Sequence, residues 1–162
     1  MKMIRYAEEK DLPDLVEIYN EAIRTLNATF DTKEKSVEER KAWFSSYGEK
    51  YPLIVYEDQG KVVGYASLSP YNIKPAYRLT VELSIYISNA YRGKGIGNKL
   101  IVEILREGKI RAFHTVISGI TGGNKGSVHL HKKNGFKEAG VIKEVGYKFN
   151  QWHDVYYYQK FL

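Results

Sequence analysis

The clearest alternation of hydrophobic and polar residues lies at the start of the stretch Thr80–Arg106. Every second position there is hydrophobic, at Val81, Leu83, Ile85 and Ile87, which is the period of an extended strand. The end of the same stretch has hydrophobic residues spaced as on one face of a helix. These residues are Ile96, Leu100, Ile101, Ile104 and Leu105. The stretch therefore predicts a strand, a turn and a helix, in that order.

Weaker patterns of the same two kinds predict the remaining elements. Further strands are expected at Met3–Ala7, Leu53–Tyr56, Val62–Leu68, Phe113–Ser118, Phe136–Val141 and Val155–Phe161. A helix that Asp11 can cap carries the apolar stripe Leu12, Leu15, Val16, Tyr19 and Ile23. A second helix starts at the capping box Ser36–Glu39 and carries Trp43 and Phe44. A third helix spans Lys125–Asn134 and is closed by Gly135.

The connections complete the expected architecture. Loops are expected at Thr25–Lys35 and Ser69–Leu79, a flexible turn at Gly119–Gly123 and a hairpin turn at Asp58–Gly60. Strands and helices alternate as in α/β proteins, but the hairpin requires antiparallel pairing. A mixed sheet of the α/β (α+β) class therefore fits better than a fully parallel one. The 162 residues are expected to form one domain, 1–162, without internal repeats.

The amino-acid composition excludes several kinds of reactive group and metal site. The chain has no cysteine, which removes disulfides, cysteine nucleophiles and thiolate metal sites. The histidines His114, His129 and His153 show no spacing typical of metal ligands, so no metal is expected. No apolar run is as long as a membrane span and no signal peptide is evident, so we expect a cytoplasmic protein. The net charge of +6 lacks a basic block, and a phosphate-bearing cofactor accounts for it at least as well as nucleic acid does.

The turn within Thr80–Arg106 is rich in glycine and runs Arg92-Gly-Lys-Gly-Ile-Gly97. Glycines let the main chain approach a ligand, and free N–H groups at a helix start attract anions. The dinucleotide fingerprint is absent because Asn98 stands at its third glycine position. A P-loop would need Ser or Thr where Gly95 stands. The pattern Arg-x-x-Gly-x-Gly predicts another kind of phosphate cradle, with a plain glycine-rich connection as the alternative.

Glu82 places a carboxylate in the middle of the predicted strand, where glutamate is disfavoured. One interpretation is a cross-strand ion pair, and the other is a base that faces a cleft. A carboxylate beside a phosphate cradle favours an enzyme that binds a phosphorylated cofactor and moves a proton.

The glycine-rich turn resembles the pyrophosphate loop of the GNAT superfamily of acetyl-CoA-dependent acetyltransferases. The segment Asn124–Phe136 resembles the Asn-x-x-Ser-x-x-Leu-His…Gly-Phe segment after the fifth strand of these enzymes. Two stretches, Pro75–Tyr86 and Lys148–Val155, are similar to one branch, the phosphinothricin N-acetyltransferases. Relatives in that branch also acetylate methionine sulfoximine and methionine sulfone. Ile18–Asn20 and Thr29-Phe30 match it as well, so the resemblance covers nearly the whole chain.

The resemblance implies a GNAT acyl-CoA N-acyltransferase fold, with acetyl-CoA as the co-substrate. This fold is a twisted mixed sheet, splayed between its fourth and fifth strands, with helices on both faces. The cofactor would lie in the splay. The resemblance also implies a homodimer with its interface near the substrate pocket, and it implies neither a nucleic-acid nor a membrane partner.

For the cofactor, the resemblance implies contacts from three segments. The pyrophosphate would be held by Arg92, Gly93, Lys94, Gly95, Ile96, Gly97 and Asn98. The pantetheine arm would form sheet-like hydrogen bonds with Ile85, Tyr86 and Ile87. Asn124, Ser127 and His131 would contact it from the following helix. For Asn124 a simple helix cap is an alternative, as is a place in the first helical turn for Ser127.

Catalytic and substrate roles follow from the same resemblance. Glu82 would be the base that takes the proton of the amine, directly or through one water. His131 stands where many members have a tyrosine that protonates the leaving thiolate, and packing on the helix is its open alternative. On the substrate side, Arg78 suits a carboxylate. Phe30 and Tyr77 would line the pocket, and Lys148 would reach a second anionic group.

The expected function is acetyl transfer from acetyl-CoA to the α-amine of a small amino-acid analogue. Candidate substrates are phosphinothricin, methionine sulfoximine and methionine sulfone, and a resistance role would follow from them. Direct attack is expected, because no cysteine can carry an acyl intermediate. The alternatives are another amine, such as a protein N-terminus, a polyamine or an aminoglycoside, and a CoA-binding regulator without catalysis.

Overall fold

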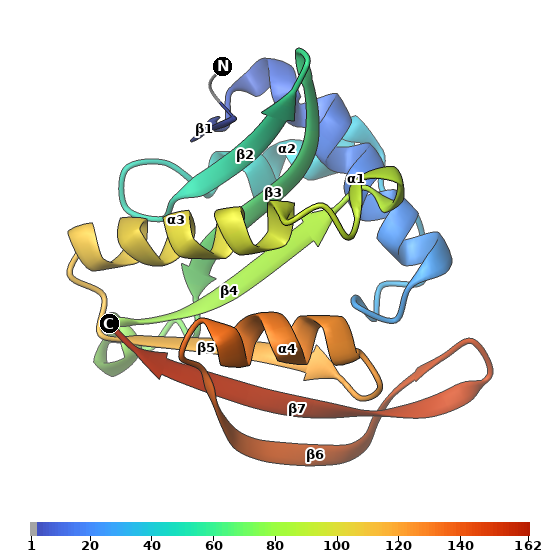
Figure 1. Ribbon diagram of the computed structural model, residues 1–162, viewed down its shortest axis with the longest axis vertical. Coiled ribbons are helices and arrows are strands. Elements are labelled where there is room, and N and C mark those ends of the chain that lie inside the picture. Colours follow the sequence, from blue (N-terminus) through green and yellow to red (C-terminus); the bar gives the residue numbers. More distant parts are fainter. Residues whose placement is uncertain (1–2) are drawn as a thin grey trace.

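A seven-stranded sheet, in the order β1-β2-β3-β4-β5-β7-β6, forms the centre of the computed structural model, which describes residues 3–162 (Figure 1). Its strands are β1 (Ile4–Tyr6), β2 (Leu53–Asp58), β3 (Lys61–Pro70), β4 (Thr80–Ile87), β5 (Thr115–Thr121), β6 (Lys137–Lys148) and β7 (Gln151–Phe161). The helices are α1 (Leu12–Thr25), α2 (Val37–Ser45), α3 (Ile96–Ile110) and α4 (Lys125–Lys133). Among these strands of residues 3–162, only β4 and β5 pair in parallel, so the expected mixed sheet is confirmed.

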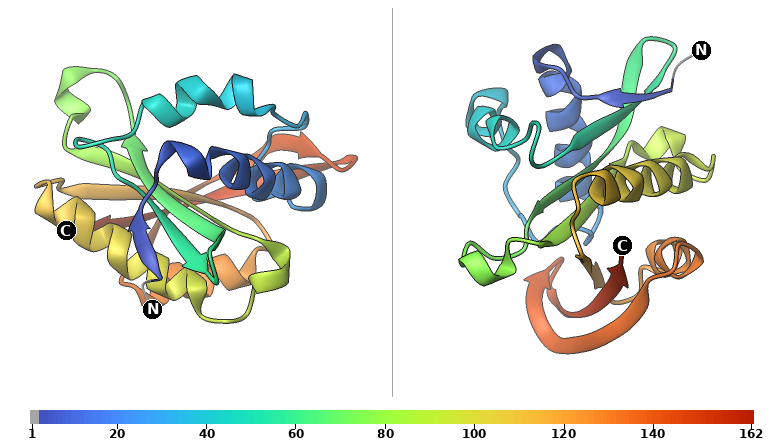
Figure 2. Two further views of the ribbon diagram at one scale, coloured as in Figure 1. Left: turned by 90° about the horizontal axis from the view of Figure 1, so that it is seen from above. Right: turned by 90° about the vertical axis from the view of Figure 1, so that its left-hand side faces the viewer.

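Helices cover both faces of the sheet, α1 and α2 on one side and α3 and α4 on the other (Figure 2). The alternation along β4 determines which side chains face each layer. Val81 and Leu83 belong to the core under α3, whereas the Tyr86 ring packs on Tyr19 of α1, with 5.4 Å between ring centroids. Glu82 and Tyr86 are an even number of positions apart on β4, so their side chains lie on the same face, and Glu82 points to the α1 side of the sheet.

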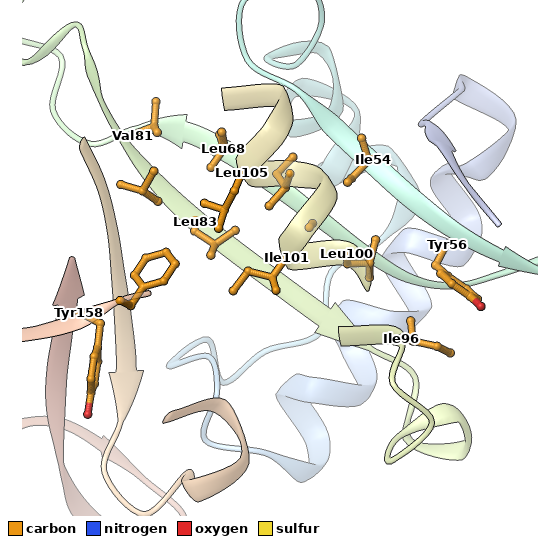
Figure 3. Packing of buried hydrophobic residues seen from close by; sticks show 14 of the residues in the cluster. Ile54, Tyr56, Leu68, Val81, Leu83, Ile96, Leu100, Ile101, Leu105 and Tyr158 are labelled. Atoms are coloured by element: carbon orange, nitrogen blue, oxygen red, sulfur yellow. The ribbon is translucent and has the colours of Figure 1, made fainter. Parts of the chain in front are cut away.

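The main core lies between α3 and the first four strands. Leu100, Ile101 and Leu105 of α3 point into the sheet, as the helical spacing predicted, and meet Leu68 and Leu83 (Figure 3). All of these side chains are at most 8% exposed. This contact fixes α3 against β4, and it therefore fixes the glycine-rich turn that connects them.

The sheet splits between its fourth and fifth strands. The parallel pairing of β4 with β5 covers only the pairs Thr80–Thr115 to Glu82–Ile117, after which the two strands diverge (Figure 1). Each strand stays paired on its other edge, β4 with β3 up to Ile87 and β5 with β7 up to Thr121. The expected splay is therefore present, and Glu82 lies at its apex.

Three local expectations need correction. Asp11 does not cap α1, because its carboxylate pairs with Arg5 at 2.8 Å and accepts from the Glu8 N–H. Gly119–Gly123 is not simply a flexible turn, since β5 continues to Thr121. The last two strands are much longer than the patterns indicated, because β6 and β7 form a long hairpin with an irregular register. Its irregularities hid the period of two from the sequence pattern.

Candidate active site

A cleft of about 700 Å³ fills the split between β4 and β5. Its walls come from β4, the glycine-rich turn, β5, α4 and the connection after α1. The cleft brings together many of the residues predicted from separate motifs. These are Glu82, Ile85, Tyr86, Ile87, Arg92, Gly93, Gly95, Gly97, Asn98, Asn124, Ser127 and His131.

The edges of the two diverging strands can bind an extended ligand. Beyond Glu82 and Ile117 neither strand has a partner within the described part of the chain on the edge that faces the cleft. Main-chain N–H and C=O groups at such an edge need hydrogen bonds, and an extended chain can supply them in sheet-like geometry. The segment Ile85–Ile87 therefore offers a suitable surface for a long, narrow ligand with amide groups.

The glycine-rich turn ends at the N-terminus of α3, in the arrangement expected of an anion cradle. Gly95 is the N-cap residue with φ at +80°, a conformation that favours glycine. The N–H of Lys99 bonds to the Gly95 carbonyl, so the N–H groups of the first helical turn before it are free to face the cleft. At Gly97 an added Cβ would lie 3.2 Å from Ile87 and Leu130 side-chain atoms, so a larger residue would press on the cleft wall.

Two residues of the predicted cradle do not line the cleft with their side chains. Ile96 is buried in the core at 5% exposure, so only its main chain is available. The Lys94 ammonium lies 5.0 Å from the centroid of the Tyr91 ring, a cation–π contact at the edge of the turn. Arg92 does line the cleft and supplies its positive charge at this end.

Glu82 is open to the cleft yet surrounded by protein at its apex. Burial raises the pKa of its carboxyl group above the ordinary glutamate value. A carboxylate with a raised pKa is a stronger base, and Glu82 faces the side of the sheet opposite to α3 and its cradle. The arrangement can accept a proton from a group that enters beside the bound ligand.

His131 is held as a neutral acceptor. Its Nδ1 lies 2.7 Å from the Ser127 carbonyl, which can only accept, so Nδ1 carries the proton. Nε2 therefore accepts from the Ser118 hydroxyl at 2.8 Å. The ring is 1% exposed, and burial lowers the pKa of His131. This geometry argues against the general-acid role, because the nitrogen toward β5 has no proton to give, and it favours the alternative of a packed, hydrogen-bonded histidine.

Asn124 and Ser127 occupy the start of α4. The Asn124 side chain accepts from the Ser127 N–H at 3.2 Å and so caps the helix. Both residues also line the cleft. The cap uses the carboxamide oxygen, which leaves the amide nitrogen of Asn124 as a donor toward a ligand.

The predicted substrate residues are not gathered in the cleft. Arg78 lines a different groove of about 600 Å³, together with Tyr6 and Arg111. Tyr77 is 41% exposed and lies against Tyr71. The Phe30 ring occupies the space where a Cβ of residue 146 would stand, and it packs on His153. Within one chain these side chains do not form the expected wall beside Glu82.

Lys148 has a different environment from the one expected. Its ammonium donates to the carbonyls of Leu26 at 2.8 Å and Thr29 at 2.9 Å, and the residue is 5% exposed. It does not line the cleft. The structure therefore argues against a contact with a second anionic group of the substrate, because the ammonium is already bonded to the main chain.

Some cleft residues were missed by the sequence patterns. Ala28 and Thr29 line the cleft from the connection after α1, and Ser118 and Thr121 line it from β5. A polar residue at Ser118, between the buried Val116 and Ile120, was the available signal, because a buried hydroxyl needs a partner. No hydrophobic pattern in the connection after α1 indicated that it would lie against the cleft.

Residues 4–156 match the family model described as the acetyltransferase (GNAT) domain. The fold, the split sheet and the cradle therefore agree with the sequence match, and the chain belongs to the GNAT acetyltransferase family. It is an acetyl-CoA-dependent N-acetyltransferase, as the names of its relatives also indicate.

Two curated relatives match over most of their length. The chain is 36% identical to the phosphinothricin N-acetyltransferase of Streptomyces coelicolor, covering 97% of this chain and 94% of the relative. It is 34% identical to an L-methionine sulfoximine/L-methionine sulfone acetyltransferase of Pseudomonas paraeruginosa, covering 96% and 92%. The predicted resemblance to this branch is therefore confirmed.

A solved relative supports the cofactor. The structure of a phosphinothricin acetyltransferase from Sinorhizobium meliloti in complex with acetyl-CoA has a TM-score of 0.95 and 36% identity. The match covers 98% of this chain and 87% of that one. Among residues 3–162 no group of histidine and acidic side chains could hold a metal ion, and no helix there is long and apolar enough to cross a membrane.

Proposed function

We propose that this enzyme transfers the acetyl group of acetyl-CoA to the α-amine of a small amino-acid analogue of the phosphinothricin or methionine sulfoximine type. The observation that carries the proposal is Glu82, a carboxylate with a raised pKa at the apex of the split sheet. The names of the relatives support the substrate class, which the cleft alone does not specify.

In the proposed reaction the amine attacks the thioester carbonyl while both reactants are bound. Glu82 accepts the proton that the amine loses, the N–C bond forms, and the C–S bond breaks as CoA thiolate leaves. The anionic pyrophosphate is held by the cradle at Arg92–Asn98, and the pantetheine arm pairs with the free edge at Ile85–Ile87. Holding both reactants side by side supplies much of the rate acceleration.

A panel of amines tests the substrate class. Thiol release from acetyl-CoA is measured with phosphinothricin, methionine sulfoximine, methionine sulfone, ordinary amino acids, a polyamine, an aminoglycoside and a peptide with a free N-terminus. We expect the highest catalytic efficiency with the small amino-acid analogues. Preference for the peptide or the polycations would support the alternative substrates, and thiol release with none of the amines would support a non-catalytic CoA-binding protein.

The dependence of the rate on pH tests the base. Glu82 must be ionised to accept a proton, so activity is lost as the pH falls through its pKa in the free enzyme. Because burial raises that pKa, the acid limb of kcat/KM for the amine should lie above the ordinary glutamate value of about 4.5. Initial rates in buffers of constant ionic strength measure this limb. A rate that stays constant down to the ordinary glutamate value would contradict the assignment.

The expected homodimer stays a prediction, and so do the cytoplasmic location and the resistance role. Light scattering on the purified protein measures the mass of the particle in solution. A mass of twice the 18.7 kDa chain would support the dimer.

A further inference from the structure

The connection after α1, residues 26–31 (Figure 1), forms one wall of the cleft and is hydrogen-bonded to α1 on one side and to β5 and β6 on the other. Ala28 and Thr29 line the cleft directly. The connection has no helix or strand of its own, so side chains from other elements must determine its position. Their hydrogen bonds show how this wall is held.

Helix α1, which packs on the first half of the sheet (β1–β4) through Tyr19 and Tyr86, holds the side chains of the connection. The Tyr19 hydroxyl of α1 lies 2.9 Å from the Thr29 hydroxyl and also donates to the Asp31 carboxylate. The Asp31 N–H donates back to the Thr29 hydroxyl at 3.2 Å. Burial and the neighbouring Asp31 raise the pKa of Tyr19 to about 12, so this phenol remains a protonated donor at neutral pH.

The second half of the sheet (β5–β7) holds the connection mainly through main-chain carbonyls, while the Asn27 amide and the Phe30 ring contact the His153 ring. The Lys148 ammonium at the end of β6 donates to the Leu26 and Thr29 carbonyls, at 2.8 and 2.9 Å. The Thr121 hydroxyl of β5 donates to the Asn27 carbonyl at 2.7 Å. These bonds come from beyond the split, so the connection links the two halves where their strands have already diverged.

Lys148 supplies two of these hydrogen bonds. An ammonium group has three donors, and a hydrogen bond from a charged donor is stronger than one from a neutral donor. Burial lowers the pKa of Lys148, because the low-dielectric surroundings oppose its charge. No salt bridge from Lys148 lies within 4.0 Å among the described residues. The two carbonyl contacts, the Phe149 ring with its centroid 5.0 Å away and the charge of Asp31 together offset the burial of this charge.

The hairpin between β6 and β7 places Lys148. Phe149 and Asn150 have φ of 55° and 60°, so they form a two-residue turn whose conformation suits the twist of a hairpin. Lys148 is therefore paired with Gln151, next to the turn. His153, on β7, donates from Nε2 to the Lys148 carbonyl at 2.9 Å and fixes the main chain of Lys148 as well.

We propose that Lys148 is a positioning residue that holds residues 26–31 as the wall of the amine side of the cleft. The connection follows α1, and Glu82 points to the α1 side of the sheet, whereas the cradle lies at the start of α3 on the opposite side. Loss of the Lys148 bonds should therefore disturb the amine more than the cofactor. This inference rests on the proposed function for the identity of the amine site.

The test compares Lys148→Met with Lys143→Met. Lys143 lies on the same strand, but its side chain is 72% exposed and pairs with Asp154 at 3.2 Å. We expect Lys148→Met to raise KM for the amine by roughly tenfold or more, the scale of losing charged hydrogen bonds. Calorimetric affinity for acetyl-CoA should stay within about twofold. Lys143→Met should change neither quantity, and Lys148→Arg, which keeps the donors, should restore part of the amine KM.

Amide hydrogen exchange provides a measurement that does not depend on turnover. Exchange at residues 27–31 should become faster in Lys148→Met and remain unchanged in Lys143→Met. Thr121→Val removes the bond to the Asn27 carbonyl with little change of shape, and it should act in the same direction with a smaller effect. It also serves as the test if Lys148→Met does not fold.

Two outcomes would overturn the inference. One is an unchanged amine KM together with unchanged exchange at residues 27–31. The other is an equal loss of affinity for amine and acetyl-CoA, which would mean a general structural role. If the wild-type enzyme acetylates none of the amines, the proposed function fails, and the exchange data alone then decide whether Lys148 holds this connection.

Discussion

Replacing Glu82 by glutamine should lower kcat by about a hundredfold to ten-thousandfold, the usual contribution of a general base. The amide has the shape of the carboxylate but cannot accept the proton of the attacking amine. Calorimetric affinity for acetyl-CoA should change little, because the cradle residues lie at the far side of the cleft, at the start of α3. The acid limb of the pH profile should also disappear, since the group that titrates is gone.

Glu138→Gln is the matched control for this substitution. Glu138 is also an exposed strand glutamate, on β6, but it lies outside the cleft. The same change of charge there should leave kcat within about twofold, as expected of a surface substitution away from any special feature. Near-normal turnover of Glu82→Gln across the pH range would show that Glu82 is a structural charge, and the base would then have to be sought elsewhere.

The cofactor side of the cleft could be predicted from the sequence because its signals are local. A strand period, a glycine-rich turn and a helix period follow one another within Thr80–Arg106, and adjacent elements in a chain are adjacent in space. The positive φ of Gly95 and its place at the start of α3 are what the glycine pattern implies. The core under α3 could be predicted for the same reason.

The other side of the cleft, which we propose to bind the amine, could not be predicted in the same way, because its contacts join distant parts of the chain. Lys148 meets Thr29 across 119 positions, and no short pattern encodes such a contact. Arg78 lies only four residues before Glu82, yet its side chain lines another groove. A short separation along the chain limits the distance between two residues but not the direction of their side chains.

His131 and Ser118 show a third case. The position of His131 on α4 was predicted, but its protonation state depends on a partner on β5 and on a carbonyl one turn earlier. Those two bonds determine which nitrogen carries the proton. From the sequence alone, a general acid and a packed, hydrogen-bonded histidine were equally good interpretations of His131. The three-dimensional arrangement is what distinguishes between these two roles.

Gly95→Val should weaken acetyl-CoA binding by roughly a hundredfold, the scale of losing one or two hydrogen bonds to charged oxygens. Two effects act together. A β-branched residue strongly disfavours the φ of +80° at Gly95, so the turn would move away from its present course. No atom lies within 4 Å of an added Cβ, so the new side chain would occupy the open space in front of the helix N-terminus, where phosphate oxygens would bind.

Gly60→Val separates these two effects. Gly60 has the same φ of +80° and the same open surroundings, but it lies in the turn between β2 and β3, outside the cleft. Both variants should lose thermal stability by a similar amount, since backbone strain of this kind costs about 1–3 kcal/mol. Only Gly95→Val should lose affinity for acetyl-CoA in calorimetry. If the two folded variants bind acetyl-CoA equally well, the turn at residues 92–98 is only a connection, and the pyrophosphate must be held by another part of the cleft.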